Sequence, residues 1–371
     1  MKKLALFATL FAVVTAFAGN FEAECQKVEK WIAEKFAETT HSFRLQHNIL
    51  RRIRNTNGSD EEKIAALHSK FPKAFGEGWK SELAAAKQQG ITFSSDNKTL
   101  LKCPTNVSSV VIPSCVTTIG EEAFEGCKNL TGVTIPDSIT TIGANAFRWC
   151  EKLTSVTIPN CVTTIGEGAF RKVPKVQVSS GNTVFMVDDS GALLDIKNNR
   201  LLYFPPGFRG RYVVPEGITI ISDGAFYECK NLTGVTIPNG VTTIGEHAFG
   251  WCENLTSVTI PNSVTTIGKG AFCWCKKLTG ITIPGVMTIE KYAFAGCENL
   301  TSVTIPNSVT TIGTWAFVEC KNLTSVTIPN SVTTIYNGAF EGCEKLTSIT
   351  IPPRCGVGKY AFPEKCKVIR R

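Results

Sequence analysis

Residues 300–322 read LTSVTIPNSVTTIGTWAFVECKN, and nearly the same 23 residues recur along most of the chain. The dipeptide Ala-Phe marks the register of each copy. Its phenylalanines are Phe124, Phe147, Phe170, Phe226, Phe249, Phe272, Phe294, Phe317, Phe340 and Phe362. All intervals are 22 or 23 residues except one of 56, between Phe170 and Phe226. A period of about 20–29 residues is typical of solenoids, so the repeat predicts the fold class.

Each repeat is predicted to hold one strand and one return arc. Leu300, Val303 and Ile305 have the spacing of a short strand that turns alternate side chains inward. The Pro that follows the strand, Pro306 in this copy, has no N–H for a ladder and therefore ends it. The apolar positions of the arc, which only stacking neighbours can bury, are Val309, Ile312, Ala316, Phe317 and Cys320. We therefore expect about ten coils in an α+β repeat protein, stacked around a parallel sheet.

The pattern L-T-S-V-T-I-P-x-S-V-T-T-I-G-x-x-A-F-x-x-C resembles the BspA-type leucine-rich repeat of bacterial and protozoan surface proteins, over roughly residues 91–371. Residues 181–215 resemble the elongated hairpin repeat of such proteins, so an elongated repeat is expected at about 174–215. Residues 93–113 resemble a shorter entry coil. The resemblance implies an exported, non-enzymatic solenoid that binds other macromolecules, often host or matrix proteins.

Residues 1–18 are predicted to be a signal peptide. Two lysines precede the apolar run Leu4 to Val14, and an Ala-x-Ala site closes it before Gly19. Elsewhere the sequence has no stretch approaching 18 apolar residues, so no transmembrane segment is expected after the signal is removed. The expected location is outside the cytoplasm: secreted, at the cell surface or in the periplasm.

Residues 19–90 differ in composition from the repeats and are predicted to form a helical N-terminal domain or cap. Apolar residues there follow helical spacing, and Ser59 to Glu62 reads as a capping box. At the other end, residues 352–371 depart from the consensus at Cys355, Pro363 and Cys366, which predicts a C-terminal cap.

The cysteines are predicted to be mostly reduced core thiols. Eight share the position three residues after the Phe, and Val173 takes that position in another copy. They are Cys127, Cys150, Cys229, Cys252, Cys275, Cys297, Cys320 and Cys343. Neighbouring coils lie within disulfide range, so bridges remain an alternative, although side chains that point in parallel suit bridging poorly. Cys355 with Cys366 is the best candidate for a disulfide, and the sequence leaves open whether this pair is bonded or reduced.

The sequence predicts no enzyme, no cofactor and no metal site. The histidines are His41, His47, His68 and His247, and none stands in a metal-binding motif. No Ser is framed as a nucleophile elbow. The net charge of +8 is spread over the chain without the clustering that a nucleic-acid footprint requires, so nucleic acid is not an expected partner.

Comparing the repeats with one another separates positions that the stack fixes from positions left free. The strand is nearly invariant, and its outward Thr ladder suits a repetitive ligand or none, because Thr is also a good strand residue. Variation collects around the Ala-Phe pair, where large aromatic residues gather. Because aromatics are enriched in binding hot spots, the candidate partner-binding residues are Trp149, Tyr227, Trp251, Trp274 and Trp315. A half-buried Trp that packs on its neighbouring coil is the structural alternative.

Two functions follow. The first is an exported interaction protein, adhesin-like, that binds a protein or glycan through the solenoid surface. The second is a structural or envelope spacer that docks to a partner through the helical segment. The sequence does not specify the ligand or the oligomeric state.

Overall fold

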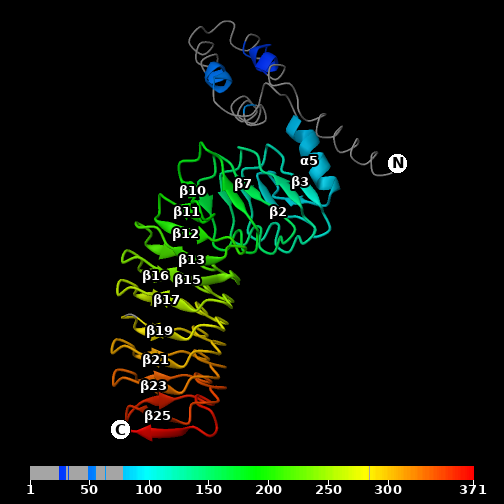
Figure 1. The fold of residues 1–371 in the computed structure, drawn as a ribbon. Coiled ribbons are helices and arrows are strands. Elements are labelled where there is room, and N and C mark those ends of the chain that lie inside the picture. The colour runs from blue at the N-terminus through cyan, green and yellow to red at the C-terminus, as the bar shows by residue number, and fades with distance from the viewer. Residues whose placement is uncertain (1–24, 31, 33–48, 56–62, 64–77, 284) are drawn as a thin grey trace, which may run out of the picture.

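The computed structural model describes residues 25–30, 32, 49–55, 63, 78–283 and 285–371. It confirms the predicted solenoid, with about 12 turns of about 23 residues, called coils below (Figure 1). The predicted signal peptide and capping box, with His41, His47 and His68, lie outside the described residues.

Within the N-terminal segment, residues 25–30 and 49–54 are helical, and Glu29 forms an ion pair of 2.6 Å with Arg54. Helix α5 (Gly78–Gln88) lies against the first coils and buries Leu83 and Ala86. The Glu82 carboxylate accepts hydrogen bonds from the backbone N–H and the hydroxyl of Ser114, at 2.7 and 2.9 Å. Helix α5 therefore covers the entry end of the solenoid core.

Most coils contribute two strands, not the single strand that the sequence pattern predicted. One row holds β3 (Ser109–Val111), β5 (Gly132–Thr134), β7 (Val156–Ile158), β9 (Val176–Val178), β13 (Gly210–Val213), β15 (Leu232–Thr236), β17 (Ser257–Thr259), β19 (Gly280–Thr282), β21 (Ser302–Thr304), β23 (Ser325–Thr327), β25 (Ser348–Ile351) and β27 (Lys367–Arg370). A second row holds β2 (Thr99–Lys102), β4 (Thr118–Ile119), β6 (Thr141–Ile142), β8 (Thr164–Ile165), β12 (Arg200–Tyr203), β14 (Ile220–Ile221), β16 (Thr243–Ile244), β18 (Thr266–Ile267), β20 (Thr288–Ile289), β22 (Thr311–Ile312), β24 (Thr334–Ile335) and β26 (Gly356–Val357).

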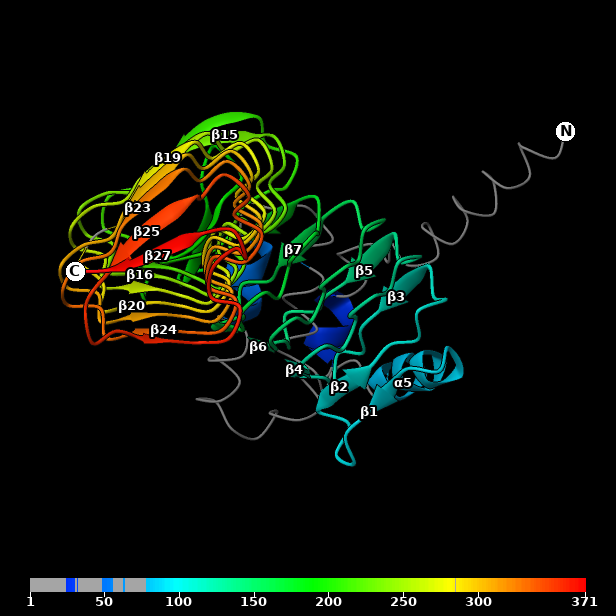
Figure 2. The ribbon, with the colours of Figure 1, turned by 90° about the horizontal axis from the view of Figure 1, so that it is seen from below.

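Figure 2 shows the two rows on different sides of the coils. Strands pair in parallel with equivalent residues opposite each other, such as Val303 with Val326 and Ile312 with Ile335. The second row is hard to predict because it rests on two residues per coil, a β-branched Thr-Ile pair. Thr hydroxyls beside it add support between coils: Thr333 donates to the Thr310 carbonyl at 3.2 Å.

The core is a ladder of the predicted phenylalanines. Phe317 stacks between Phe294 and Phe340, with ring centroids 5.3 and 5.1 Å away, and all three side chains are fully buried. Each coil thus buries its ring against the rings of its neighbours.

Hydrogen bonds from the thiols explain why the repeat position three residues after the Phe holds Cys more often than Val. All eight thiols are buried, and seven donate their S–H to the Phe carbonyl of the preceding coil, as from Cys320 to Phe294 at 3.2 Å and from Cys150 to Phe124 at 3.0 Å. Cys127, at the start of the column, donates to the Cys103 carbonyl at 3.6 Å instead. Burial raises the pKa of the Cys320 thiol well above its usual range, so the thiol stays protonated. The solenoid's cysteines are all free, including Cys355 in the terminal coil.

Replacing Cys320 by Val is expected to cost less than about 1 kcal/mol in the free energy of unfolding, because the S–H is a weak donor and the Phe294 carbonyl keeps a backbone donor, the Cys297 N–H. Urea denaturation measures this cost. In the unmodified chain, alkylation followed by mass spectrometry should label Cys252 and Cys275 only after unfolding. Disulfide-linked peptides from this column would contradict the prediction.

A hairpin interrupts the stack inside residues 174–215. Strands β10 (Phe185–Val187) and β11 (Leu193–Asp195) pair antiparallel, and β11 pairs antiparallel with β12. Strand β1 (Thr92–Phe93) forms a similar antiparallel pair with β2 at the entry. Neighbouring side chains of β12 and the residue after it face different cores: Tyr203 joins the N-terminal core and Phe204 the C-terminal core. The solenoid therefore has an N-terminal block (91–178) and a C-terminal block (204–371), and it bends between them (Figure 1).

Candidate partner-binding surface

The return arcs that carry an Ala-Phe pair, from Phe124 to Phe340, pass twice through the left-handed region of backbone conformation, two residues before and two residues after the Phe. The arc of Phe362 does so once, at Tyr360. In the coil of Phe317 these positions are Trp315, with φ of 53°, and Glu319, with φ of 59°. In the next coil they are Gly338 and Gly342, also with positive φ. Glycine adopts this conformation without steric cost, whereas other residues pay about 1–2 kcal/mol.

All four Trp residues of the repeats occupy these left-handed positions. Trp149, Trp251 and Trp274 have φ values of 60°, 62° and 60° in the column after the Phe, and Trp315 stands in the column before it. Their placement is not required by the backbone, because glycine serves at the same positions in other coils. Some other interaction must therefore offset the strain.

The aromatic residues stack in pairs along the solenoid axis. The rings of Trp251 and Trp274 are 5.1 Å apart and inclined by 17°. Those of Tyr292 and Trp315 are 5.2 Å apart and inclined by 13°. Stacked pairs of this kind contribute about 0.5–1.5 kcal/mol beyond area burial, which offsets part of the backbone strain of their two residues.

A glycine closes each pair on the C-terminal side. A Cβ on Gly296 would lie 2.6 Å from the Trp274 ring, and one on Gly338 would lie 2.3 Å from the Trp315 ring. The C-terminal ring of each pair, Trp274 or Trp315, thus packs against the backbone of the next coil at its glycine. Both faces of Trp274 and of Trp315 are covered, and these rings present mainly their edges to solvent.

The structure brings together four of the five predicted residues and adds two, His247 and Tyr292. Trp251, Trp274 and Trp315 lie on the same arc surface, with Tyr292 as the unpredicted partner of Trp315. Tyr292 occupies the repeat position of Trp315 one coil earlier, and this was the sequence signal for it. Tyr227 lies at the N-terminal end of this group.

Tyr227 packs against a histidine and an arginine, not against another Trp or Tyr ring. Its ring meets the His247 ring edge-on at 6.5 Å, and the Arg171 guanidinium lies 4.4 Å from its centroid. Trp149 is separate from the group, because it belongs to the N-terminal block, where the Arg148 guanidinium covers its ring at 3.9 Å.

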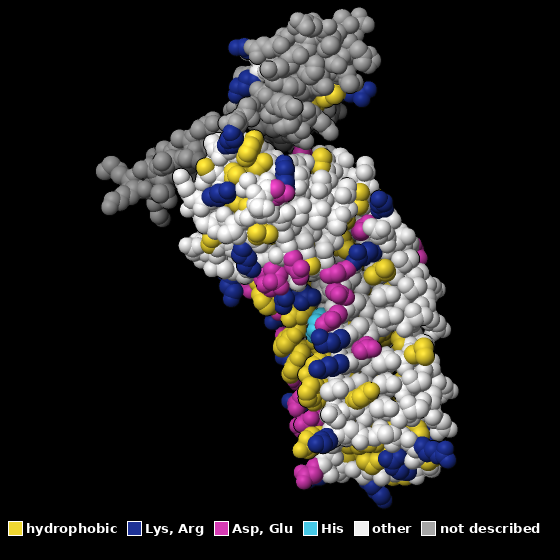
Figure 3. Space-filling model, turned by 180° about the vertical axis from the view of Figure 1, so that it is seen from behind, with side chains coloured by type: hydrophobic (Ala, Val, Ile, Leu, Met, Phe, Trp, Pro, Cys, Tyr) yellow, Lys and Arg dark blue, Asp and Glu magenta, His cyan; other side chains and the backbone are white. Residues whose placement is uncertain are grey.

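We define the aromatic stripe as Tyr227, His247, Trp251, Trp274, Tyr292 and Trp315. On the coils between Glu228 and Glu319, the arc positions two before, one after and two after the Phe hold no Asp, Glu, Lys or Arg. Figure 3 shows hydrophobic side chains gathered in a file along this part of the solenoid, bordered by charged ones. The half-buried rings of the aromatic stripe therefore form an apolar strip that is bordered by charged side chains.

Basic side chains stand one position before the left-handed column on two of these coils. The Lys291 ammonium lies 5.1 and 5.2 Å from the ring centroids of Tyr292 and Trp315. Within the described part of the chain Lys291 has no acidic partner, whereas Lys269 pairs with Glu246 at 2.9 Å. One margin of the stripe thus carries an unneutralised positive charge.

A Cys, a His and a Glu meet beside the stripe, which the sequence did not reveal. His247 Nδ1 lies 3.4 Å from Cys273 Sγ, and His247 Nε2 lies 3.5 Å from Glu246. Burial lowers the pKa of His247, so the imidazole is neutral at pH 7. Burial also raises the pKa of the Cys273 thiol to about 11, and only 4% of the residue is exposed. A protonated, covered thiol is not an activated nucleophile.

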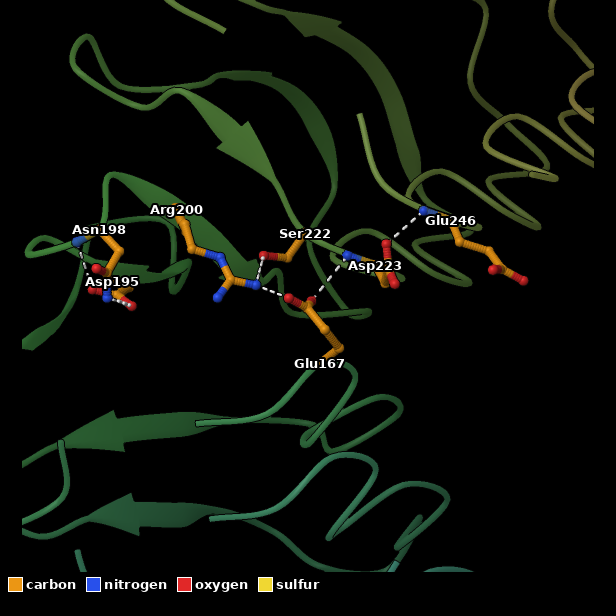
Figure 4. A network of polar contacts seen from close by, with 7 residues as sticks. All are labelled: Glu167, Asp195, Asn198, Arg200, Ser222, Asp223 and Glu246. Carbon is orange, nitrogen blue, oxygen red and sulfur yellow. Dashed lines mark hydrogen bonds and ion pairs between the residues drawn. The ribbon is translucent and has the colours of Figure 1, made fainter. Parts of the chain in front are cut away.

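A second polar cluster lies at the junction of the two blocks, in a pocket of about 550 Å³ (Figure 4). The Glu167 carboxylate pairs with Arg200 and accepts the Asp223 N–H at 3.1 Å. Asp223 in turn accepts the Glu246 N–H at 2.6 Å, and Arg200 donates to Ser222 at 3.1 Å. These contacts connect the two blocks across the gap where β8 and β12 do not pair, so the cluster braces the junction.

Among the residues that the structure describes, no group of three or more His, Cys, Asp or Glu could hold a metal ion. No helix in the same ranges is both long and apolar enough to span a membrane.

A model of the BspA-type leucine-rich repeat region, built of six repeat copies, matches residues 96–186, 211–288 and 266–370. A leucine-rich cell surface protein from Faecalibacterium prausnitzii A2-165 is 30% identical, with a TM-score of 0.54. The match covers 66% of this chain and 60% of that protein, so less than two thirds of its length is represented. No curated protein matches the chain.

Two further solved structures are similar. A leucine-rich repeat protein from Eubacterium ventriosum ATCC 27560 is 26% identical with a TM-score of 0.59, over 73% of this chain and 91% of that one. The pneumococcal vaccine antigen PcpA is 20% identical with a TM-score of 0.55, over 71% and 68%. At this identity the likeness to PcpA shows the fold alone.

Proposed function

Because this chain belongs to the BspA-type leucine-rich repeat family of surface proteins, we propose that it is an exported, adhesin-like interaction protein that binds a protein partner through the aromatic stripe. The observation that carries the proposal is the presence of Trp and Tyr at left-handed positions where other coils have glycine. Large aromatics that the backbone does not require, held half-exposed on one surface, fit a binding hot spot.

A protein fits the stripe better than a glycan does. Sugar rings are bound through exposed aromatic faces, but Trp251 covers one face of Trp274 and Gly296 the other. The exposed edges suit apolar side chains, and the indole N–H groups can donate to a partner's carbonyls. We accordingly propose a protein ligand. Because the Cys273 thiol is protonated and covered, we propose no catalytic activity.

The test uses a substitution that the fold already accepts. In Trp274→Gly, the residue matches Gly296 of the same column in the next coil and relieves the backbone strain. Binding of the full chain to a panel of purified matrix proteins and glycans is measured by surface plasmon resonance. We expect a protein ligand whose affinity falls roughly thirtyfold in Trp274→Gly and in Trp251→Gly, since losing a central anchor costs about 2 kcal/mol.

The matched controls are Thr259→Ala and Thr282→Ala on the exposed strand face, with folding checked by circular dichroism. These should leave the affinity unchanged. If the Thr variants fail to bind while the Trp variants bind normally, recognition runs through the strand face. If residues 19–90 alone carry all binding, the alternative of a spacer docked through the helical segment is correct.

A further inference from the structure

We propose that the aromatic stripe binds an amphipathic α-helix of the partner, laid along the solenoid axis with acidic residues on the flank that faces Lys269 and Lys291. This inference rests on the proposed function and specifies the shape and charge of the segment that docks. Three properties of the stripe carry it: its period, its length and its charge.

The period of the stripe matches that of a helix. The core rings that mark the coils from Phe226 to Phe317 are 4.7, 5.1, 5.6 and 5.3 Å apart. An α-helix repeats its apolar face about every 5.4 Å along its axis, whereas an extended strand repeats one face about every 6.7 Å. Over three coils, the apolar repeat of a helix therefore moves out of register with the coils by less than about 1 Å. The repeat of a strand moves out of register by about 4.5 Å, nearly the rise of a whole coil.

The length of the stripe suits a helix of ordinary size. The ring spacings place Phe226 and Phe317 about 20 Å apart along the stack, which corresponds to about 14 residues at 1.5 Å per residue. A helix of four turns presents apolar residues at intervals of three and four. These side chains would meet the ring edges of successive coils, from Tyr227 to Trp315.

The charge of the margin selects the flank of the helix. Lys291 stands over Tyr292 and Trp315 and has no acidic partner within the described residues. Lys269 adds a second ammonium on the preceding coil, although Glu246 neutralises it in part. The apolar strip itself contributes no charge on the coils of Phe249, Phe272 and Phe294. Acidic side chains beside the apolar face of the ligand would be complementary to this margin.

The experiment selects ligands without assuming their shape. A phage-displayed library of random 16-residue peptides is panned on the full chain, after depletion on the Trp274→Gly variant. We expect binders with apolar residues at i, i+3 or i+4, and i+7, and with Asp or Glu on one flank. A synthetic binder should lose at least about tenfold in affinity towards Trp274→Gly and towards Lys291→Glu, and its charge-reversed form should prefer Lys291→Glu.

Binders with strictly alternating apolar residues, or binders indifferent to Lys291→Glu, would overturn the helical and charged character of the ligand. The absence of any binder that discriminates Trp274→Gly would overturn it as well. Failure here is distinguishable from failure of the proposed function. If a matrix protein depends on Trp251 and Trp274 but the selected peptides are extended, only the helix inference is lost.

Discussion

Alanine in place of Phe317 is expected to lower the free energy of unfolding by about 3–5 kcal/mol, the usual range for truncating a buried Phe. The ring is fully buried between Phe294 and Phe340 and nearly parallel to both, at 11° and 5°. Its removal leaves a cavity bounded by two rigid coils, which cannot collapse without breaking the parallel pairing of β21, β23 and β25.

Because each coil contacts only its neighbours, this damage should stay local. Native-state hydrogen exchange should show lost protection in the coils from Phe317 to the C-terminus and near-normal protection around Phe124. Phe317→Leu, which retains most of the volume, should lose clearly less in urea denaturation. Equal losses for Ala and Leu would contradict the cavity mechanism.

The second large effect is expected at Tyr203 and Phe204, two neighbouring residues that serve different cores. Tyr203 contacts Phe170 edge-on at 6.4 Å and donates its hydroxyl to the Val173 carbonyl at 2.7 Å. Phe204 lies 4.7 Å from Phe226 and 4.4 Å from Tyr212. Alanine at either position should cost about 3–5 kcal/mol, but Tyr203→Ala should weaken the N-terminal block and Phe204→Ala the C-terminal block.

Hydrogen exchange resolves the two blocks. Protection should fall around β7 in Tyr203→Ala and around β15 in Phe204→Ala. Tyr203→Phe is the matched control, because it removes only the hydroxyl and leaves the Val173 carbonyl without that donor, at a cost of about 1–2 kcal/mol. Equal loss of protection in both blocks for both alanine variants would show that the two cores unfold as one unit.

The sequence predicted the repeating fold well because register, core and strand ends repeat in every copy. The Phe ladder, the Pro after each strand and the buried Cys column could each be read from position alone. The second strand row was missed because its strands are two residues long. Backbone dihedrals explain the other gap: the arc passes through the left-handed region at residues as different as Glu122, Gly168 and Trp315, so composition did not reveal it.

The candidate surface was only partly predictable. Repeat comparison identified Trp251 and Trp274 on neighbouring coils, and the structure stacks them. Tyr292 was not among the candidates, because its importance comes from its contact with Trp315 on the next coil, which depends on the coil rise. Trp149 shares a column with Trp251, but the hairpin lies between them and the bend separates their blocks.

The division of the core at the hairpin bears on how such a protein changes in length over evolution. Duplication or loss of a whole 23-residue unit alters the core of one block and leaves the packing of the other block unchanged. The two cores are separate, because Tyr203 packs into one and Phe204 into the other. A unit gained after Gly338 would also leave both stacked pairs intact, because a glycine already terminates each of them. Natural selection can therefore change the length of the solenoid without changing the aromatic residues on its surface.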